Sequence, residues 1–291
     1  MSAVDLWRPV RFGKTDLAVS RLGIGSSYGV SGASLERAHE RGVNFFFYGL
    51  RRRGDFGRGL ARIAKKDRDR VVVAAQSYTR VAALMRPSLE SVLRTLRTDH
   101  VDLLGLGWWN DVPPPRILDA ARKLVDEGKV RHVLISSHQR PKFLPMMELP
   151  GMGGIMIRYN AAHAGAEREV FPHVARQDAG VLAFTATRWG ALVNPRLVPA
   201  GEAVPRASDC YRFVLSHPAV HATLCGPKDD AELDEAMAAL DRGPMDEDEL
   251  AWMRRVGAHV RANASERALG WVDRIVAAVR GTGRPALPAG R

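Results

Sequence analysis

Eight short apolar runs, each followed by a helical pattern, are the feature that most limits what this 291-residue chain can fold into. The runs are continuous rather than alternating, which is typical of parallel strands buried on both faces. Eight strand–helix units in one chain predict an α/β fold, a (β/α)8 TIM barrel. The predicted strands are Arg21–Ser27, Val43–Tyr48, Val71–Ser77, Val101–Trp108, Val130–Ser137, Gly154–Tyr159, Val181–Ala186 and Val220–Gly226.

Amphipathic patterns between these runs predict the helices of the barrel. Pro87 and Pro115 suit the first turn of a helix, and Gly42, Gly128 and Gly180 suit the left-handed position that ends one. The predicted helices are Ser34–Arg41, Asp55–Lys66, Pro87–Leu96, Pro115–Glu127, Pro141–Glu148, Arg168–Gln177, Cys210–Ser216 and Asp230–Leu240.

The two ends of the chain add elements to the barrel. Arg11–Gly13 and Ala18–Ser20 flank a turn and predict an N-terminal β-hairpin. Beyond the last strand, Asp246–Arg261 and Ala268–Arg280 predict extra C-terminal helices, followed by a Gly/Pro-rich disordered tail, Gly281–Arg291. We therefore expect one barrel domain over residues 1–280. A doubly wound sheet is the alternative, but no G-x-G-x-x-G motif follows an early strand.

Composition narrows the class of protein further. The apolar fraction of 46% excludes a disordered chain, and no apolar run is long enough to span a membrane. The first residues lack the apolar stretch of a secretory signal. Cys210 and Cys225 are the two cysteines, which is too few for a disulfide framework or a thiolate zinc site. We therefore expect a cytoplasmic protein.

The basic excess is carried by arginine. The chain has 43 Lys and Arg against 32 Asp and Glu, a formal net charge of +11, and seven of the basic residues are lysines. Such an excess is either a solvated basic surface or a cluster of guanidinium groups facing an anionic ligand. The positions of the arginines in the fold decide between these readings.

Several motifs, in this order and spacing, resemble the aldo-keto reductase family over roughly residues 8–260. They are R-F-G-K-T-D-L-A-V-S-R-L-G-I-G (11–25), R-G-V-N-F-F (41–46), S-L-x-S-x-L-R-x-L-x-T-D-H-V-D-L-L (88–104), L-V-D-E-G-K-V-R (124–131), R-Y-N (158–160), V-F-P-x-V-A-R (170–176) and C-G-P-K-x-x-x-E-L-D-E-A (225–236). The resemblance implies an NADP(H)-dependent carbonyl reductase in which a tyrosine, tuned by lysine and aspartate, donates a proton while a histidine orients the carbonyl.

The catalytic positions implied by the resemblance are all replaced in this sequence. Phe47 stands for the aspartate, Arg52 for the tyrosine, Gln76 for the lysine and Gly107 for the histidine. A phenol has an ordinary pKa near 10 and needs such partners to transfer a proton near neutral pH. The candidate substitutes are Tyr48, Gln76 and His138, although a structural role is the favoured reading for both Tyr48 and His138.

The resemblance also implies where the cofactor would lie. Ser136 and Ser137 stand where the family holds the carboxamide, with Arg158 at or beside a family glutamine. Phe184 would stack on the nicotinamide, and Lys228 would meet the 2′-phosphate. The remaining cofactor positions are Gly25, Ser26, Asn160, Thr185, Gly226 and, beside the adenine, Glu235.

Function in a TIM barrel lies on the loops after the strands, so the residues there predict the substrate. Five arginines and two tryptophans fall at this rim: Arg51, Arg52, Arg53, Arg158, Arg188, Trp108 and Trp109. We expect a cationic, aromatic-lined mouth that binds a small anionic, partly planar substrate. The other reading is that these arginines face solvent or pair with acidic neighbours such as Asp55 and Asp111.

Three functions remain open. The first is an NADP(H)-dependent oxidoreductase with a rebuilt acid–base set, and the second is a non-redox enzyme that uses an arginine-lined pocket. The third is a non-catalytic relative that binds a cofactor or a partner. No metal site is expected, because the histidines are scattered without a ligand motif. Nucleic-acid binding is not expected either, because no recognition motif accompanies the basic charge.

Overall fold

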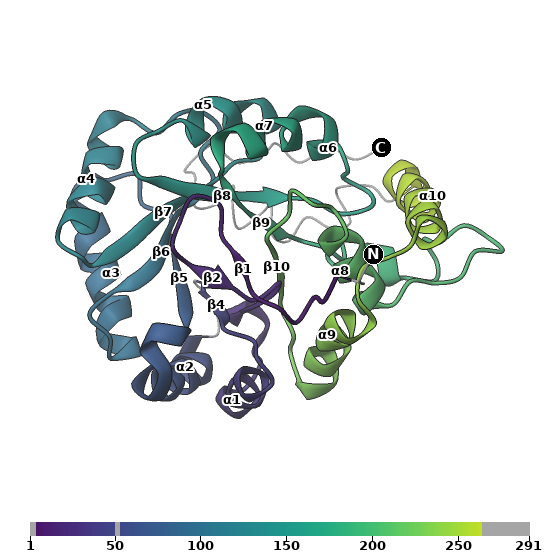
Figure 1. The fold of residues 1–291 in the computed structure, drawn as a ribbon, viewed down its shortest axis with the longest axis horizontal. Helices are drawn as coiled ribbons and strands as arrows, with labels where there is room; N and C mark the ends of the chain where they lie inside the picture. Colours follow the sequence, from purple (N-terminus) through teal and green to yellow (C-terminus); the bar gives the residue numbers. More distant parts are fainter. Residues whose placement is uncertain (1–3, 50–52, 264–291) are drawn as a thin grey trace, which may run out of the picture.

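The computed structural model describes residues 4–49 and 53–263, and within them eight parallel strands close into a barrel. The order around the barrel is β10-β3-β4-β5-β6-β7-β8-β9, so each strand pairs with its neighbour in sequence (Figure 1). This confirms the predicted TIM barrel, and all eight predicted strands form. They are β3 (Leu22–Gly25), β4 (Phe45–Tyr48), β5 (Val72–Ser77), β6 (Val101–Leu106), β7 (Val130–Ser136), β8 (Met152–Arg158), β9 (Gly180–Phe184) and β10 (Ala222–Cys225).

The strands are apolar throughout because both of their faces are buried. Inward-facing side chains such as Phe45, Leu103 and Leu182 pack together inside the barrel. Their outward-facing neighbours, such as Phe46 and Leu104, pack under the ring of helices instead. Each strand therefore needs apolar residues at consecutive positions rather than at alternate ones.

The predicted N-terminal hairpin forms from β1 (Val10–Arg11) and β2 (Ala18–Val19), and it lies across the centre of the barrel (Figure 1). Phe12, which follows β1, is fully buried against the barrel interior. A Cβ atom on Gly180, at the start of β9, would lie 2.3 Å from the Phe12 ring. The ring thus closes the end of the barrel at which the strands begin, and leaves the opposite end for a site.

The helices surround the barrel in the predicted order (Figure 1). No helix in the described part of the chain is long and apolar enough to cross a membrane. Their bounds are α1 (Gly32–Glu40), α2 (Arg53–Asp67), α3 (Ala82–Leu96), α4 (Pro115–Asp126), α5 (Phe143–Met147), α6 (Ala166–Glu169), α7 (Phe171–Gln177), α8 (Ala207–Leu215), α9 (Asp230–Arg242) and α10 (Glu247–Asn263).

Two details of the helix predictions are wrong. Helix α3 begins at Ala82, so Pro87 lies inside it rather than in its first turn. Helix α7 ends with Asp178 in the left-handed conformation, at φ 44°, and Gly180 does not take that role. Position 180 requires glycine because the Phe12 ring leaves no room for a side chain. Gly42 and Gly128 do have positive φ, as predicted.

Some predictions fall on residues outside the described part of the chain. These are the helix at Ala268–Arg280, the tail Gly281–Arg291, and the rim residues Arg51 and Arg52. Arg53 begins α2.

Candidate functional site

The inward-facing residues at the carboxyl ends of the strands line one opening, which we call the barrel mouth. Side chains alternate along a strand, so a residue two positions after an inward-facing one also faces inward. Phe47 follows Phe45 in this way, and Phe184 follows Leu182. The barrel mouth is formed by Phe47, Gln76, Gly107, Ser136, Arg158 and Phe184.

Gln76, on β5, is buried in this mouth with 8% of its surface exposed. Its amide lies against β6, where a Cβ atom on Gly105 would be 2.6 Å from Oε1 and one on Gly107 would be 2.5 Å from Nε2. Both positions must therefore be glycine for the Gln76 side chain to lie as it does. Within the described residues, Oε1 of Gln76 has no hydrogen-bond partner.

Three aromatic rings stand side by side on one side of the mouth. Tyr78 lies 4.7 Å from Trp108, and Trp108 lies 5.9 Å from His138, measured between ring centroids. The Tyr78 ring fills the space beside Gly107, where a Cβ atom would be 2.4 Å from Cδ1. Burial raises the pKa of Tyr78 to about 12, so its phenol is protonated near neutral pH and can act as a hydrogen-bond donor.

Hydrogen bonds hold the loops that carry these rings. The Ser136 hydroxyl accepts from the backbone N–H of Trp108 at 2.9 Å, and its carbonyl accepts from that of Trp109 at 2.8 Å. Arg80 donates to the carbonyls of Gly107 and Trp108, at 2.9 and 2.8 Å, while its guanidinium lies 3.9 Å from the centroid of the Trp109 ring. Trp108 has a φ of 52°, which these contacts maintain.

The adjoining side of the mouth, at the ends of β8 and β9, is positively charged. Arg158 ends β8, and its guanidinium lies 5.9 Å from the centroid of the Trp189 ring. His163 is 8% exposed, and burial, followed by the charges of Arg158 and Arg188, lowers its pKa to about 3. The imidazole is therefore neutral, and the positive charge on this side belongs to arginine.

Two predicted site residues do not reach the mouth. Arg188 is 1% exposed, and its Nη1 donates to the carbonyl of Val260 at 2.6 Å, so it anchors α10. Tyr48 lies on the outer face of β4, 3% exposed, with its ring 6.3 Å from that of Phe56 on α2. It faces away from the barrel interior because it follows the inward-facing Phe47.

Predicted cofactor residues around the mouth are largely engaged with the backbone. Asn160 is fully buried: its Nδ2 donates to the carbonyl of Thr185 at 2.8 Å, and its Oδ1 accepts from the N–H of Ala162 at 3.0 Å. Ser26, after β3, accepts from the N–H of Gly49 at 3.1 Å. Ser137 accepts from the N–H of Gln139 at 3.0 Å. These side chains shape the rim rather than present free polar groups.

Residues after β10 form the other predicted cofactor segment. The ring of Tyr28 lies on Gly226, where a Cβ atom would be 2.4 Å from Cδ2. Lys228 is exposed and forms an ion pair with Glu232 on α9.

Glu235 is engaged as well, since it accepts from the Arg206 side chain and from the N–H of Ser208. Gly25, at the end of β3, is buried, and a Cβ atom there would be 3.4 Å from the carbonyl oxygen of Cys225.

Tyr78 and Arg80 are the mouth residues that the sequence analysis missed. Tyr78 is two positions after Gln76, so the alternation of side chains along a strand could have placed it on the same face. Arg80 follows the same strand, but it is not among the rim arginines predicted from the sequence. Among the described residues, no group of three or more His, Cys, Asp or Glu side chains could hold a metal ion.

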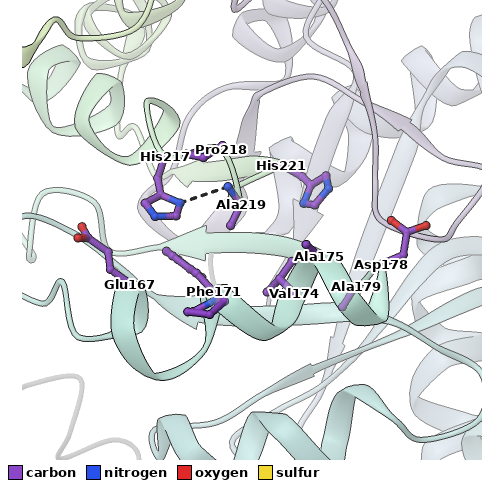
Figure 2. Close-up of a pocket in the computed structure, with 11 residues that line it drawn as sticks. Glu167, Phe171, Val174, Ala175, Asp178, Ala179, His217, Pro218, Ala219 and His221 are labelled. Carbon is purple, nitrogen blue, oxygen red and sulfur yellow. Dashed lines mark hydrogen bonds between the residues drawn. The ribbon is translucent and has the colours of Figure 1, made fainter.

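A separate cavity of about 490 Å³ lies away from the mouth, between α7 and the connection from α8 to β10 (Figure 2). Its walls include Glu167, Phe171, His217 and His221. His217 accepts from the N–H of Ala219 at 3.2 Å, and its ring lies 4.6 Å from that of Phe171 (Figure 2). None of the predicted site residues lines this cavity.

The closed parallel barrel defines a TIM-barrel protein, and comparison with known sequences gives its family. A sequence model of the aldo/keto reductase family matches residues 33–206. The chain belongs to that family.

The three relatives described next are 20–26% identical to this chain. Methylglyoxal reductase YeaE of Escherichia coli (strain K12) is 26% identical over 144 residues, which are 46% of this chain and 51% of that protein. The chain thus matches about half the length of this curated relative. An aldo/keto reductase from Klebsiella pneumoniae, in complex with NADP and acetate, is 24% identical, with a TM-score of 0.73 over 86% of this chain and 95% of that one. Aldo-keto reductase AKR11C1 from Bacillus halodurans, in its holo form, is 20% identical, with a TM-score of 0.73 over 86% and 96%.

Proposed function

We propose that this protein is an NADP(H)-dependent oxidoreductase of the aldo-keto reductase kind, with a rebuilt active site and a small, anionic or aromatic substrate. The observation that carries the proposal is the pairing of Arg158 with Phe184 across β8 and β9 at the mouth. A guanidinium group binds carboxylates and phosphates, and a phenyl ring stacks on flat ligands. The Klebsiella relative, whose structure holds NADP and acetate, supports this combination.

The residues present fit NADP(H) at two points. Phe184 presents a partly buried ring on the inward face of β9, suited to stacking on nicotinamide. Lys228 is 62% exposed, and its Nζ is 2.5 Å from Glu232 and 3.9 Å from Asp229. A phosphate group can replace these carboxylates, because exposed ion pairs contribute little free energy. Bound NADPH would supply the hydride for reduction of a substrate carbonyl.

The chain's own residues then orient the substrate. Arg158 binds its acidic group, and the rings of Tyr78 and Trp108 cover its flat face. Tyr78 occupies the space beside Gly107, at which the family resemblance implies a carbonyl-orienting histidine. We assign the Tyr78 hydroxyl, which stays protonated near neutral pH, as the hydrogen-bond donor to the substrate oxygen.

The Arg158 assignment is tested with a matched pair of substrates. NADPH binding is measured by fluorescence titration, and NADPH oxidation is followed with para-carboxybenzaldehyde and its methyl ester. In Arg158→Gln, KM for the acid rises by about 10- to 100-fold, since a hydrogen bond to a charged group is worth ~1.5–3 kcal/mol. KM for the ester is unchanged. Arg116→Gln, on the exposed face of α4, is the control and leaves both values unchanged.

Absence of NADPH binding to the wild-type protein would overturn the cofactor proposal. An equal rise in KM for acid and ester would overturn the role of Arg158. The Tyr78 assignment requires that Tyr78→Phe lowers kcat by about 10²-fold, as loss of one oxyanion donor does elsewhere, without weakening NADPH binding.

A second candidate function is a cofactor-binding relative that does not reduce carbonyls. Phe47, Gln76 and Gly107 favour it, because none of these side chains transfers a proton near neutral pH. NADPH binding without oxidation by any carbonyl compound in the same assay would select this candidate.

A further inference from the structure

The unpartnered oxygen of Gln76 is a buried acceptor inside the barrel mouth. Gln76 is 8% exposed, and within the described residues its Oε1 receives no hydrogen bond. A buried acceptor left unpaired costs about 1–3 kcal/mol, so native proteins satisfy nearly all of them. An acceptor left open among the described residues at a functional position is therefore a place where a bound ligand can donate.

The direction of this side chain is fixed by its surroundings. Gln76 follows the inward-facing Ala74 by two positions, so it faces the barrel interior rather than the helices. The absence of side chains at Gly105 and Gly107 leaves the space that the amide fills, since a Cβ atom at either position would overlap it. The Tyr78 ring lies against Gly107 as well, so the amide and an aromatic surface meet at one point of the mouth.

We propose that Gln76 accepts a hydrogen bond from an O–H or N–H group of the ligand, so that the preferred ligands are flat acids with a second, hydroxyl or amino, group. The acidic group of such a ligand lies toward Arg158, and this part rests on the proposed function. Its ring lies along Tyr78 and Trp108, and its hydroxyl or amino group donates to Oε1 of Gln76. A ligand with a bare carbonyl or ether at that point leaves Oε1 unsatisfied and is disfavoured.

The test compares donors with acceptors of the same shape. Binding is measured by ligand-observed NMR titration for benzoate, for the three hydroxybenzoate isomers and for their methoxy counterparts. Phenol and anisole form a neutral pair that tests the hydrogen bond to Gln76 without any contribution from Arg158. The proteins are the wild type, Gln76→Met and, as a matched control, Gln139→Met, which changes an exposed glutamine on the rim.

We expect at least one hydroxybenzoate to bind the wild type about 5- to 30-fold more tightly than its methoxy counterpart, the effect of one buried hydrogen bond. Phenol shows the same preference over anisole. Gln76→Met abolishes both preferences, and Gln139→Met keeps them. Gln76→Glu retains an acceptor oxygen, so it keeps the preference for phenol but loses affinity for the acids, a pattern that a merely structural role would not produce.

Several outcomes overturn the inference. A wild-type protein that binds hydroxyl and methoxy compounds equally has no acceptor at this point. A preference that survives in Gln76→Met, or a preference for the methoxy compounds, also contradicts it. If acids bind no better than phenol while the hydroxyl preference depends on Gln76, the anionic substrate class fails and the role of Gln76 stands.

Discussion

One buried and one partly buried histidine, His163 and His221, make the stability of this protein fall steeply in mild acid. Burial lowers the pKa of His163 to about 3, and burial with the charge of Arg21 lowers that of His221 to about 4. Both imidazoles titrate near 6.5 in the unfolded chain, so below that pH the unfolded state binds protons that the folded state does not. Unfolding then becomes more favourable by about 1.4 kcal/mol per pH unit for each histidine. Between about pH 7 and pH 5 the loss is about 2 kcal/mol for each histidine, or about 4 kcal/mol together.

The assay is urea denaturation of the wild type, His163→Gln and a control, His259→Gln, which changes an exposed histidine on α10. Carboxylates contribute equally in all three proteins, so the differences between them isolate the histidine. His163→Gln should lose about 2 kcal/mol less than the wild type between about pH 7 and pH 5, and the control should match the wild type. If His163→Gln and the wild type have the same pH dependence, the imidazole is not held neutral and the reasoning is wrong.

Three further changes test the framework of the barrel. Phe12→Ala leaves a cavity at the end of the barrel where the strands begin, and should lower the free energy of unfolding by about 3–5 kcal/mol in urea denaturation. A loss below about 1 kcal/mol would contradict the packing of this ring. Asp102→Asn replaces a fully buried carboxylate that accepts from Arg68 at 2.9 Å, and should lower the free energy of unfolding by about 3–5 kcal/mol. An unchanged midpoint of thermal unfolding would contradict this. Arg188→Ala removes the donor to Val260, and hydrogen exchange should become faster in the last turn of α10 but not in α4.

The strands and their order could be predicted because each of them needs a continuous apolar run, which is visible locally. Placing the rim residues also requires knowing which face of its strand each side chain lies on. Tyr48 could have been placed correctly, since it follows an inward-facing position by one residue and must face the helices. The same alternation would have added Tyr78 to the site.

Arg188 could not be placed from sequence. Its guanidinium is buried against Val260, 72 positions further along the chain, and no local pattern carries that contact. The surroundings of the Gln76 amide were equally hidden, because they depend on Gly105 on β6 and Gly107 just after it.

Asn160 has a consequence for how ligands are selected. With both ends of its amide bonded to the loops after β8 and β9, it joins the segments that follow Arg158 and Phe184. Their separation is therefore set before any ligand arrives, and little conformational entropy remains to be lost there on binding. The order of this part of the rim therefore comes from the chain itself and needs no ligand to impose it.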